Sequence, residues 1–437
     1  MSTAPLRVAV IGGGIAGLTV ALAIAKKIEE GANIQLDVYE QAPKFAEIGA
    51  GVAFGPNAQR ALRLIGVGGA LDAVAGPPGD DANLWFEYRV GDSGENSGKH
   101  FATITGTDAA RGSVHRADFL DQLIKRLPTD TPNVRTHFNH RASSYTPHND
   151  GVTLHFERED AEPAEVDLVI GSDGIKSLLR GHLYTRKGLD LDPQRARYSE
   201  WVAWRGLISK ETFENVFGPS VSNKTMHCGY GRHILHFPVR NGALVNIVAF
   251  VRDPDHKKLG NHSGPWSEPR PKEEMLEDFA SFNEQCRALL GAIDSPSIWG
   301  IFSLPPIEHI VDDGVVLIGD AASATTPHCG AGAGQAVESA LYLAAVLAHP
   351  SILTAPASSR RAALSRALEV YKSVRHPRAQ KVQIESDKGG KLYEFLGPEG
   401  DDLGKMKETL ESRMSWIWEH DTEREMQRMV QMLDEQA

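Results

Sequence analysis

The chain has 437 residues, of which 41% are hydrophobic and 24% are charged, and its formal net charge is -11. This composition is typical of a globular protein with two or three domains, and the negative charge argues against nucleic acid as a partner. The three cysteines, Cys228, Cys286 and Cys329, are odd in number and far apart. They show no metal-ligand spacing, so we expect no metal site, and they favour a reducing, cytoplasmic compartment.

The N-terminal segment has the pattern of a strand, a glycine turn, a helix and a second strand. The apolar run Leu6–Ile11 predicts a buried strand, residues 15–30 have a helical pattern, and residues 35–39 predict a strand that ends at Glu40. Residues 8–25 are apolar enough to resemble a signal anchor, but they contain four glycines and lack a positive leader and a cleavage site. We therefore expect no targeting segment and no membrane span.

Gly12, Gly14 and Gly17 have the spacing G-x-G-x-x-G between the first strand and the helix. In a dinucleotide site the first glycine permits the tight turn, the second lets the backbone approach a pyrophosphate, and the third lets the helix pack on the strand. The helix N-terminus supplies free N–H groups for the phosphates. Glu40 would bind a ribose diol and repel a 2′-phosphate, so the site favours FAD or NAD over NADP. The alternative is a glycine-rich turn without a ligand, and the order of strand, helix and acid argues against it.

Later segments repeat the combination of apolar run, glycine and polar residue. A second glycine-rich loop precedes a helix that starts near Pro56, and Arg116 stands at the mouth of a helix at residues 114–127. Two further buried strands end in acid-plus-glycine turns that contain Asp173 and Asp320. This repetition indicates a long ligand that is contacted by several segments distributed along the whole chain.

The middle of the chain has a different pattern. Residues 186–274 contain short alternating or apolar runs split by Gly and Pro, which predicts an antiparallel sheet, and residues 76–104 add further strands to it. The tail at residues 405–433 has apolar residues at helical spacing, which predicts a packing helix or a dimer contact.

Three separated motifs resemble those of the single-component flavoprotein aromatic hydroxylases. They are the glycine fingerprint with Glu40, the stretch "GSDGIKSLLR" at residues 171–180, and "GDAASATTPHCGAGAGQAVESA" at residues 319–340. The loop "EIGAGVAFGPNAQRAL" and the tail "SWIWEHD" are most similar to the salicylate hydroxylase group. The resemblance implies an α/β fold with a Rossmann-like FAD-binding domain, a smaller antiparallel β-sheet substrate domain and C-terminal helices.

The resemblance also implies domain boundaries and cofactor contacts. The FAD-binding domain would be discontinuous, at residues 1–75, 105–185 and 275–385, with the substrate-binding sheet at 76–104 and 186–274 and a helical segment at 386–437. Segment 330–334 would lie against the isoalloxazine ring, with its amides aimed at the edge that becomes negative on reduction. The residues expected to bind FAD are Gly12, Gly14, Gly17, Glu40, Ala53, Arg116, Asp173, Asp320, Gly332 and Ala333.

His328 and Arg205 are the expected catalytic residues. His328 follows Pro327 at the start of the flavin loop, where a neutral imidazole could take a phenol proton. Arg205 would pair with a substrate phenolate or carboxylate. A backbone-bonded loop histidine and a salt-bridged arginine are the alternatives. Arg232, His233 and His236 remain further, unranked candidates, and Ser323 stands where many relatives of this family carry His.

These features together predict an FAD-dependent monooxygenase that hydroxylates a phenolic aromatic acid with NADH or NADPH as a transient reductant and O2 as co-substrate. Salicylate, converted to catechol with loss of CO2, is the expected substrate. Another hydroxylase, acting on 3-hydroxybenzoate, a hydroxynicotinate or a polyketide phenol, stays open. A flavin-dependent dehydrogenase that makes no hydroperoxide and a flavin-binding interaction protein are the alternatives from other classes. A homodimer also stays open.

Overall fold

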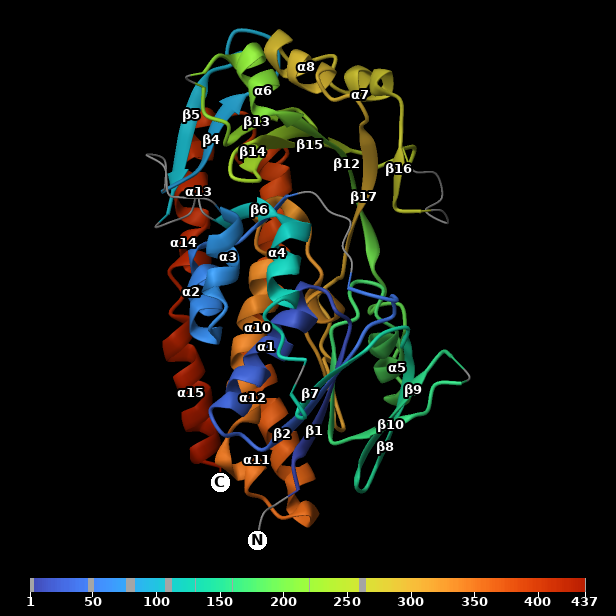
Figure 1. The fold of residues 1–437 in the computed structure, drawn as a ribbon. Coiled ribbons are helices and arrows are strands. Elements are labelled where there is room, and N and C mark those ends of the chain that lie inside the picture. The colour runs from blue at the N-terminus through green and yellow to red at the C-terminus, as the bar shows by residue number, and fades with distance from the viewer. Residues whose placement is uncertain are drawn as a thin grey trace.

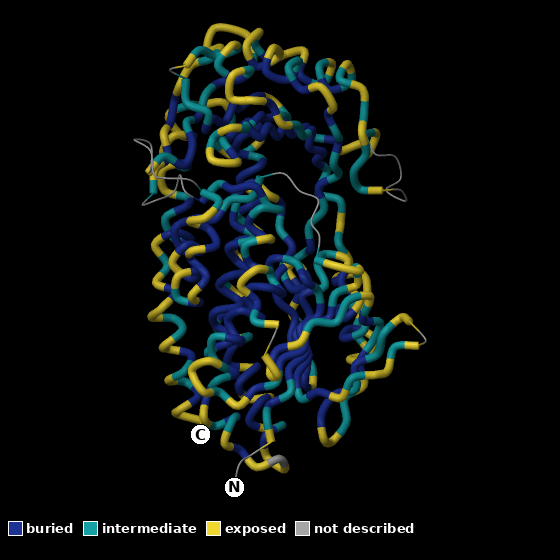
Figure 2. Tube along the Cα trace, in the orientation of Figure 1, coloured by how far each residue is buried: buried dark blue, intermediate teal, exposed yellow. Residues whose placement is uncertain are grey.

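The computed structural model describes residues 4–45, 51–75, 83–106, 112–129, 131–158, 160–219, 221–258 and 265–436. The molecule is elongated, with an eight-stranded sheet at one end and a six-stranded sheet with its helices at the other, where both termini also lie (Figure 1). Buried residues are concentrated in the six-stranded sheet and the helices beside it (Figure 2). Within the described residues, no helix combines the length and the hydropathy needed to cross a membrane.

The six-stranded sheet contains the N-terminal strand near its centre. Its order is β18-β19-β11-β1-β2-β7, and neighbouring strands are parallel except for β18 and β19. Parallel strands that are buried on both faces have continuous apolar sequences, which is why β1 could be predicted to the residue. The strands are β1 (Leu6–Ile11), β2 (Ile34–Tyr39), β7 (Val134–His137), β11 (Leu168–Gly171), β18 (Val311–Asp312) and β19 (Val315–Leu317).

Two helices, α1 (Ile15–Glu29) and α10 (Gly332–Leu347), pack against each other beside this sheet. The helix α12 (Ala357–Tyr393) is 37 residues long and runs along the molecule from the six-stranded sheet to the eight-stranded one (Figure 1). The shorter helices are α2 (Pro56–Ile65), α3 (Gly68–Ala75), α4 (Arg116–Ile124), α5 (Leu178–Arg186), α9 (Asp320–Ser323), α11 (Pro350–Leu353), α13 (Leu403–Arg413), α14 (Ser415–Trp418) and α15 (Thr422–Asp434).

Two small sheets complete this end of the molecule. An antiparallel sheet is formed by β8 (Ala142–His148), β9 (Gly151–Phe156) and β10 (Ala164–Val166). The strands β3 (Gly51–Ala53) and β6 (Ser113–His115) form a separate antiparallel pair.

The eight-stranded sheet has the order β16-β17-β12-β15-β14-β13-β4-β5 and is antiparallel except for the β13–β4 pair. The helices α6 (Lys210–Phe217), α7 (Lys272–Asp278) and α8 (Glu284–Gly291) cover its outer face around Trp204. The strands are β4 (Leu84–Val90), β5 (His100–Thr105), β12 (Arg197–Ser209), β13 (Thr225–Gly229), β14 (Arg232–Val239), β15 (Leu244–Arg252), β16 (Ser267–Pro269) and β17 (Ser297–Ser303).

The structure carries this sheet past residue 274, where the sequence pattern placed a boundary. β17 pairs with β12, and α7 and α8 share a buried core with the outer face of the sheet. The boundary expected at residue 386 falls inside α12. Both differences have one reason: strand pairing over long sequence separations and helix continuity depend on tertiary packing, which local composition does not encode.

A buried ionic cluster joins three of the helices. Glu338 on α10 is 0% exposed and accepts hydrogen bonds from Asn57 on α2 at 2.6 Å and from two guanidinium nitrogens of Arg378 on α12 at 2.8 Å each. Burial opposes the negative charge of Glu338, but the hydrogen bonds and the charge of Arg378 outweigh it, so the pKa of Glu338 lies below its ordinary value.

Glu338→Gln should lower the free energy of unfolding by about 3–5 kcal/mol at neutral pH, because it leaves a buried guanidinium without its counter-charge. The folded-state pKa is depressed, so this stabilisation is complete above the ordinary carboxyl pKa and is lost as the pH falls through the lowered value. Denaturant titration of both proteins at several pH values measures the difference. The control is Glu411→Gln, which removes a half-exposed partner of Lys407 and should cost less than about 1 kcal/mol. Equal losses in the two variants would contradict the assignment.

Candidate functional site

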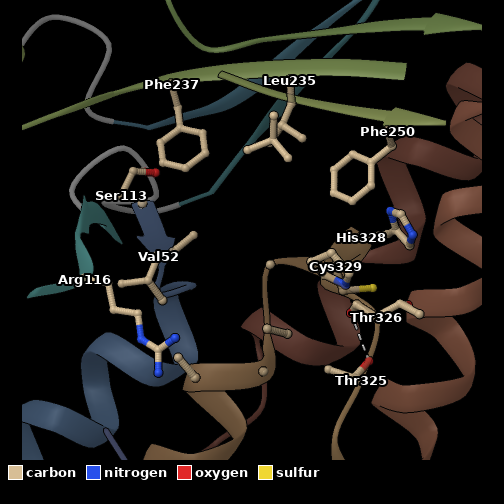
Figure 3. Close-up of a pocket in the computed structure, with 18 of the residues that line it drawn as sticks. Val52, Ser113, Arg116, Leu235, Phe237, Phe250, Thr325, Thr326, His328 and Cys329 are labelled. Carbon is tan, nitrogen blue, oxygen red and sulfur yellow. Dashed lines mark hydrogen bonds between the residues drawn. The ribbon is translucent and has the colours of Figure 1, made fainter. Parts of the chain in front are cut away.

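A cavity of about 380 Å³ lies between the inner face of the eight-stranded sheet and the N-terminal ends of α1 and α10. Phe237, Leu235 and Phe250 point from the sheet toward Val52, Thr326 and His328 on the opposite wall (Figure 3). Other residues of the lining are Gly14, Ala53, Trp85, Tyr88, Ser113, Arg116, Arg205, Met226, His233, Val248, Trp299, Asp320, Cys329, Gly332, Ala333 and Tyr393.

The glycine turn has the geometry that its spacing predicts. Gly12 has φ +100°, and a Cβ there would lie 2.7 Å from the carbonyl oxygen of Ser172. A Cβ on Gly17 would lie 1.8 Å from the carbonyl oxygen of Gly12, so the helix could not pack on the strand with a side chain there. A Cβ on Gly14 would meet nothing within 4 Å, and Gly14 lines the cavity. Gly12 and Gly17 are therefore required by close contacts within the protein, whereas the space beside Gly14 is free for a ligand.

Glu40 lies against this turn rather than in the cavity wall. Its carboxylate accepts hydrogen bonds from the backbone N–H groups of Gly13 at 2.7 Å and Ala42 at 2.8 Å. The acid is therefore at the end of β2 beside the start of α1, the position that a ribose-binding acid occupies in a dinucleotide site.

The opposite wall is the loop that precedes α10. Gly330 has φ +58° and follows the 3₁₀ turn Pro327–Cys329, while Gly332 and Ala333 form the first turn of α10. All three line the cavity, where the free N–H groups of a helix N-terminus favour negative charge. Gly334 was expected to lie against the isoalloxazine ring with the rest of this segment. In the structure it allows α10 to pack closely on α2, because a Cβ there would lie 2.9 Å from the Cβ of Ala58.

The two acidic strand-end residues differ in what they contact. Asp173 accepts hydrogen bonds from the N–H groups of Leu178 at 2.9 Å and Leu179 at 3.2 Å, and therefore caps α5 instead of lining the cavity. Asp320 is open to the cavity at the start of α9. Burial raises the pKa of Asp320, and the charges of Arg116 and Arg180 oppose that rise.

The β3–β6 pair brings Ala53 and Arg116 into the wall. Ala53 pairs with Ser113, and β6 leads directly into α4, whose first residue is Arg116. Figure 3 shows the Arg116 guanidinium on the side of the cavity opposite His328.

Arg205 reaches the cavity from β12. Its guanidinium carbon lies 4.7 Å from the ring centroid of Trp299, and no carboxylate of the described residues forms an ion pair with it. Burial, together with the charge of Arg116, lowers the pKa of Arg205 to about 10. A cation in the wall of a cavity, without an acidic partner among the described residues, is placed to attract an anionic group of a ligand.

His328 is enclosed by aromatic rings. The ring centroids of Trp201 and Phe250 each lie 4.9 Å from its imidazole, and neither imidazole nitrogen has a hydrogen-bond partner among the described residues. A Cβ on Gly390 of α12 would lie 2.7 Å from Nε2, so this glycine makes room for the ring. Burial, and then the charges of neighbouring basic groups, hold the pKa of His328 well below its usual range. His328 is therefore a neutral imidazole at neutral pH.

His328 and Arg205 lie toward different ends of the cavity. Trp201, the neighbour of His328, is four residues from Arg205 on β12, which corresponds to about 13 Å along a strand. Sequence reasoning named His233 without ranking it and missed Glu394, which hydrogen-bonds to it from the end of α12. No local pattern could have indicated Glu394, because its partners are 161 and 193 residues away.

Comparison with known proteins identifies related chains over almost the full length. A family model for the FAD binding domain matches residues 5–386. A salicylate hydroxylase of Pseudomonas putida is 38% identical over 432 residues, which cover 96% of this chain and 94% of that protein. A 6-methylsalicylate 1-monooxygenase of Aspergillus terreus is 34% identical, with 96% and 90% covered. A solved salicylate hydroxylase substrate complex has a TM-score of 0.85 at 35% identity and covers 98% of both chains. The resemblance and the fold predicted from the motifs are confirmed.

Gly14→Ala and Gly17→Ala should separate ligand binding from folding. Gly14→Ala places a methyl group in the open cradle, so FAD affinity should fall while the melting temperature of the apoprotein stays close to that of the wild type. Gly17→Ala forces a methyl group against the Gly12 carbonyl and should lower the apoprotein melting temperature. Fluorescence titration of FAD and thermal unfolding of the apoproteins measure both effects. Unchanged FAD affinity in Gly14→Ala would contradict the placement of the cofactor.

Proposed function

The chain belongs to the FAD-binding aromatic monooxygenases of the salicylate hydroxylase type, and from this premise we propose that it converts salicylate to catechol and CO2. The electrons would come from NADH or NADPH and the oxygen atom from O2. The observation that carries the proposal is the cavity itself, which combines a dinucleotide-binding turn with an apolar sheet wall. Two of its polar side chains, Arg205 and His328, have buried nitrogen atoms without a hydrogen-bond partner among the described residues.

The described residues fit FAD. The open cradle at Gly14, the N-termini of α1 and α10, and the side chain of Arg116 all face the same cavity. The helix N-termini and Arg116 would hold the phosphates and the reduced ring, and Glu40 would hold the adenosine ribose. FAD, when bound, supplies electron transfer from the nicotinamide donor and the activation of O2.

The protein has to prepare the aromatic substrate for attack. A phenol becomes electron-rich when its hydroxyl loses a proton, and His328 offers a neutral imidazole at the end of the cavity that the aromatic side chains enclose. We assign His328 a hydrogen bond with the substrate oxygen that promotes this deprotonation. Leu235, Phe237 and Phe250 exclude water around the ring.

Arg205 would neutralise the negative charge of the substrate. Its guanidinium is held over Trp299 and has no acidic partner among the described residues, so its charge would attract an anion into the cavity. Salicylate has its carboxylate and its hydroxyl on adjacent ring carbons, so a molecule whose hydroxyl lies at His328 would interact with Arg205 through the charge and without a direct hydrogen bond. The neighbouring charge of Arg116 adds to the attraction for an anion. The three cysteines are buried, free thiols, which supports a cytoplasmic enzyme.

A substrate panel tests the proposal. The FAD-loaded protein is given NADH or NADPH in air with salicylate, 6-methylsalicylate, 3-hydroxybenzoate or a hydroxynicotinate, and product, nicotinamide oxidation and hydrogen peroxide are all measured. Catechol formed in proportion to nicotinamide oxidised supports the proposal. A different hydroxylated product would assign another phenolic substrate. Oxidation that yields only peroxide with every compound would instead support a flavin-dependent dehydrogenase or oxidase.

Arg205→Gln should raise KM for salicylate by about threefold to tenfold, because it removes a charge that attracts the anionic substrate with an energy of about 1 kcal/mol over about 10 Å. The FAD content should be unchanged. The matched control is phenol, which lacks the carboxylate and should show no such rise. Steady-state kinetics with both compounds decide the outcome. A similar KM change for both would show that Arg205 supports the fold of the sheet rather than the substrate anion.

His328→Ala should bind FAD and should still be reduced by the nicotinamide donor under anaerobic conditions. Hydroxylation should slow by about 10²–10⁴-fold, the usual contribution of general-base assistance. The electrons consumed should appear as hydrogen peroxide, because the substrate ring is not activated. The ratio of product to nicotinamide oxidised measures the effect. A ratio equal to that of the wild type would show that His328 has no part in deprotonation.

A further inference from the structure

His233 lies in the cavity wall next to His328 and has a buried carboxylate behind it. Its imidazole, on β14, stacks on Phe250 with ring centroids 4.6 Å apart and meets His328 edge-on at 5.2 Å. Nδ1 of His233 lies 3.0 Å from Oε1 of Glu394, and both residues are 0% exposed. The pair therefore joins the cavity to the C-terminal end of α12.

Glu394 is fixed by the sheet. The indole N–H of Trp201 donates to both carboxylate oxygens, at 2.9 Å each. The backbone carbonyl of Glu394 accepts a hydrogen bond from the N–H of Gly231 at 3.1 Å, at the turn into β14. The carboxylate thus has one position, with the indole and the His233 ring as its hydrogen-bond partners.

The second ring nitrogen of His233 has no partner. Nε2 is buried, and no described residue forms a hydrogen bond with it. The two nitrogens of an imidazole point away from each other, so Nε2 is directed away from Glu394. Because His233 lines the cavity, a bound hydroxyl group can supply the missing hydrogen bond.

The acidities of the two groups favour storage of a proton on the carboxylate. Burial raises the pKa of Glu394 to about 8, against the opposing effects of the Trp201 N–H and of two arginines. Burial lowers the pKa of His233 to about 3. A proton that reaches this pair therefore resides on Glu394. The titratable and charged groups that face the pair are Arg232 on β14, Arg252 on β15, Cys228 on β13, His328 in the loop before α10, and Tyr393 beside Glu394.

We propose that His233 and Glu394 form a proton relay that takes the hydroxyl proton of the phenolic substrate and stores it on Glu394. This inference rests on the proposed function, since it requires a phenol in the cavity. The substrate O–H bond breaks, Nε2 of His233 gains that proton, and Nδ1 gives its proton to Glu394. The imidazole stays neutral and changes tautomer, and the negative charge moves from Glu394 to the substrate oxygen. The same two transfers in reverse return the proton to the product.

The relay complements His328. His328 has no acidic partner among the described residues, and burial holds its pKa well below the usual range. Its imidazole N–H can therefore donate a hydrogen bond to the substrate oxygen and stabilise the phenolate, while the proton itself goes to His233. His233 contacts the substrate, whereas Glu394 acts through His233 as a positioning and proton-storing residue.

The test uses Glu394→Gln, which keeps an oxygen for the Trp201 N–H but cannot store the proton. With salicylate, the ratio of product to NADH oxidised in the wild type should rise as the pH rises through about 8, because the relay needs an ionised Glu394. The variant should lack this rise, and its hydroxylation should be slower by about 10²–10⁴-fold.

A second readout needs no turnover. Bound to the oxidised, FAD-loaded enzyme, 5-nitrosalicylate should show its phenolate absorption at a higher pH in the wild type than in Glu394→Gln, because an ionised Glu394 competes with the phenol for the single negative charge of the pair. Phenolate bands that appear at the same pH in both proteins would overturn the relay.

Two tryptophan variants provide a matched pair. Trp201→Phe removes an N–H donor that stabilises the Glu394 carboxylate, so the pKa of Glu394 should rise further. The increase in the ratio of product to NADH oxidised should therefore occur at a higher pH. Trp204→Phe removes an equivalent indole–carboxylate bond, to Asp278 at 2.8 Å on the other face of β12, and should leave the rise in place. If Glu394→Gln does not fold, the two tryptophan variants test the relay by themselves. The relay would be overturned if the pH at which the ratio of product to NADH oxidised rises were shifted equally in both variants, or in neither.

The outcomes separate the two proposals. The relay alone would be overturned if the wild type produced catechol and Glu394→Gln showed the same ratio of product to NADH oxidised with the same pH dependence. A wild type that hydroxylates none of the hydroxybenzoates would overturn the proposed function and the relay together.

Discussion

The close approach of backbone segments at the carboxyl ends of β1, β11 and β19 is the constraint on which the site depends. Side chains at Gly12 and Gly17 would collide with the carbonyl oxygens of Ser172 and Gly12, and a Cβ on Gly319 would lie 2.7 Å from the Cβ of Ala16. These contacts bring the N-termini of α1 and α10 to one cavity, where their free N–H groups and positive dipole ends act on the same ligand. The eight-stranded sheet then closes that cavity with an apolar face.

Two buried glutamates show how partners decide the role of a side chain. Glu338 and Glu394 are both 0% exposed, but the guanidinium of Arg378 holds the pKa of Glu338 low, whereas burial raises the pKa of Glu394 to about 8. Glu338 is therefore an anion at neutral pH that joins three helices. Among the described residues, the carboxylate of Glu394 has an indole N–H and an imidazole as its hydrogen-bond partners and no guanidinium, so it can gain and lose a proton near neutral pH.

The sequence predicted those parts of the molecule that depend on local pattern. The strand Leu6–Ile11, the helix after it and the glycine turn follow from apolar periodicity and from backbone positions without room for a Cβ. The Asp173 motif was found, but its carboxylate caps α5, a role that spacing alone does not separate from ligand binding. The pairing of β17 with β12 and the contact of His233 with Glu394 join distant segments, so no local signal could predict them.

The most direct test of the central claim is isotope labelling of the product. The FAD-loaded protein converts salicylate with a nicotinamide donor under ¹⁸O2, and the product and the released gas are analysed by mass spectrometry. We predict catechol that carries one ¹⁸O atom per molecule and one CO2 for each catechol. Recovery of unlabelled salicylate, with all of the consumed ¹⁸O2 found as hydrogen peroxide, would contradict the account.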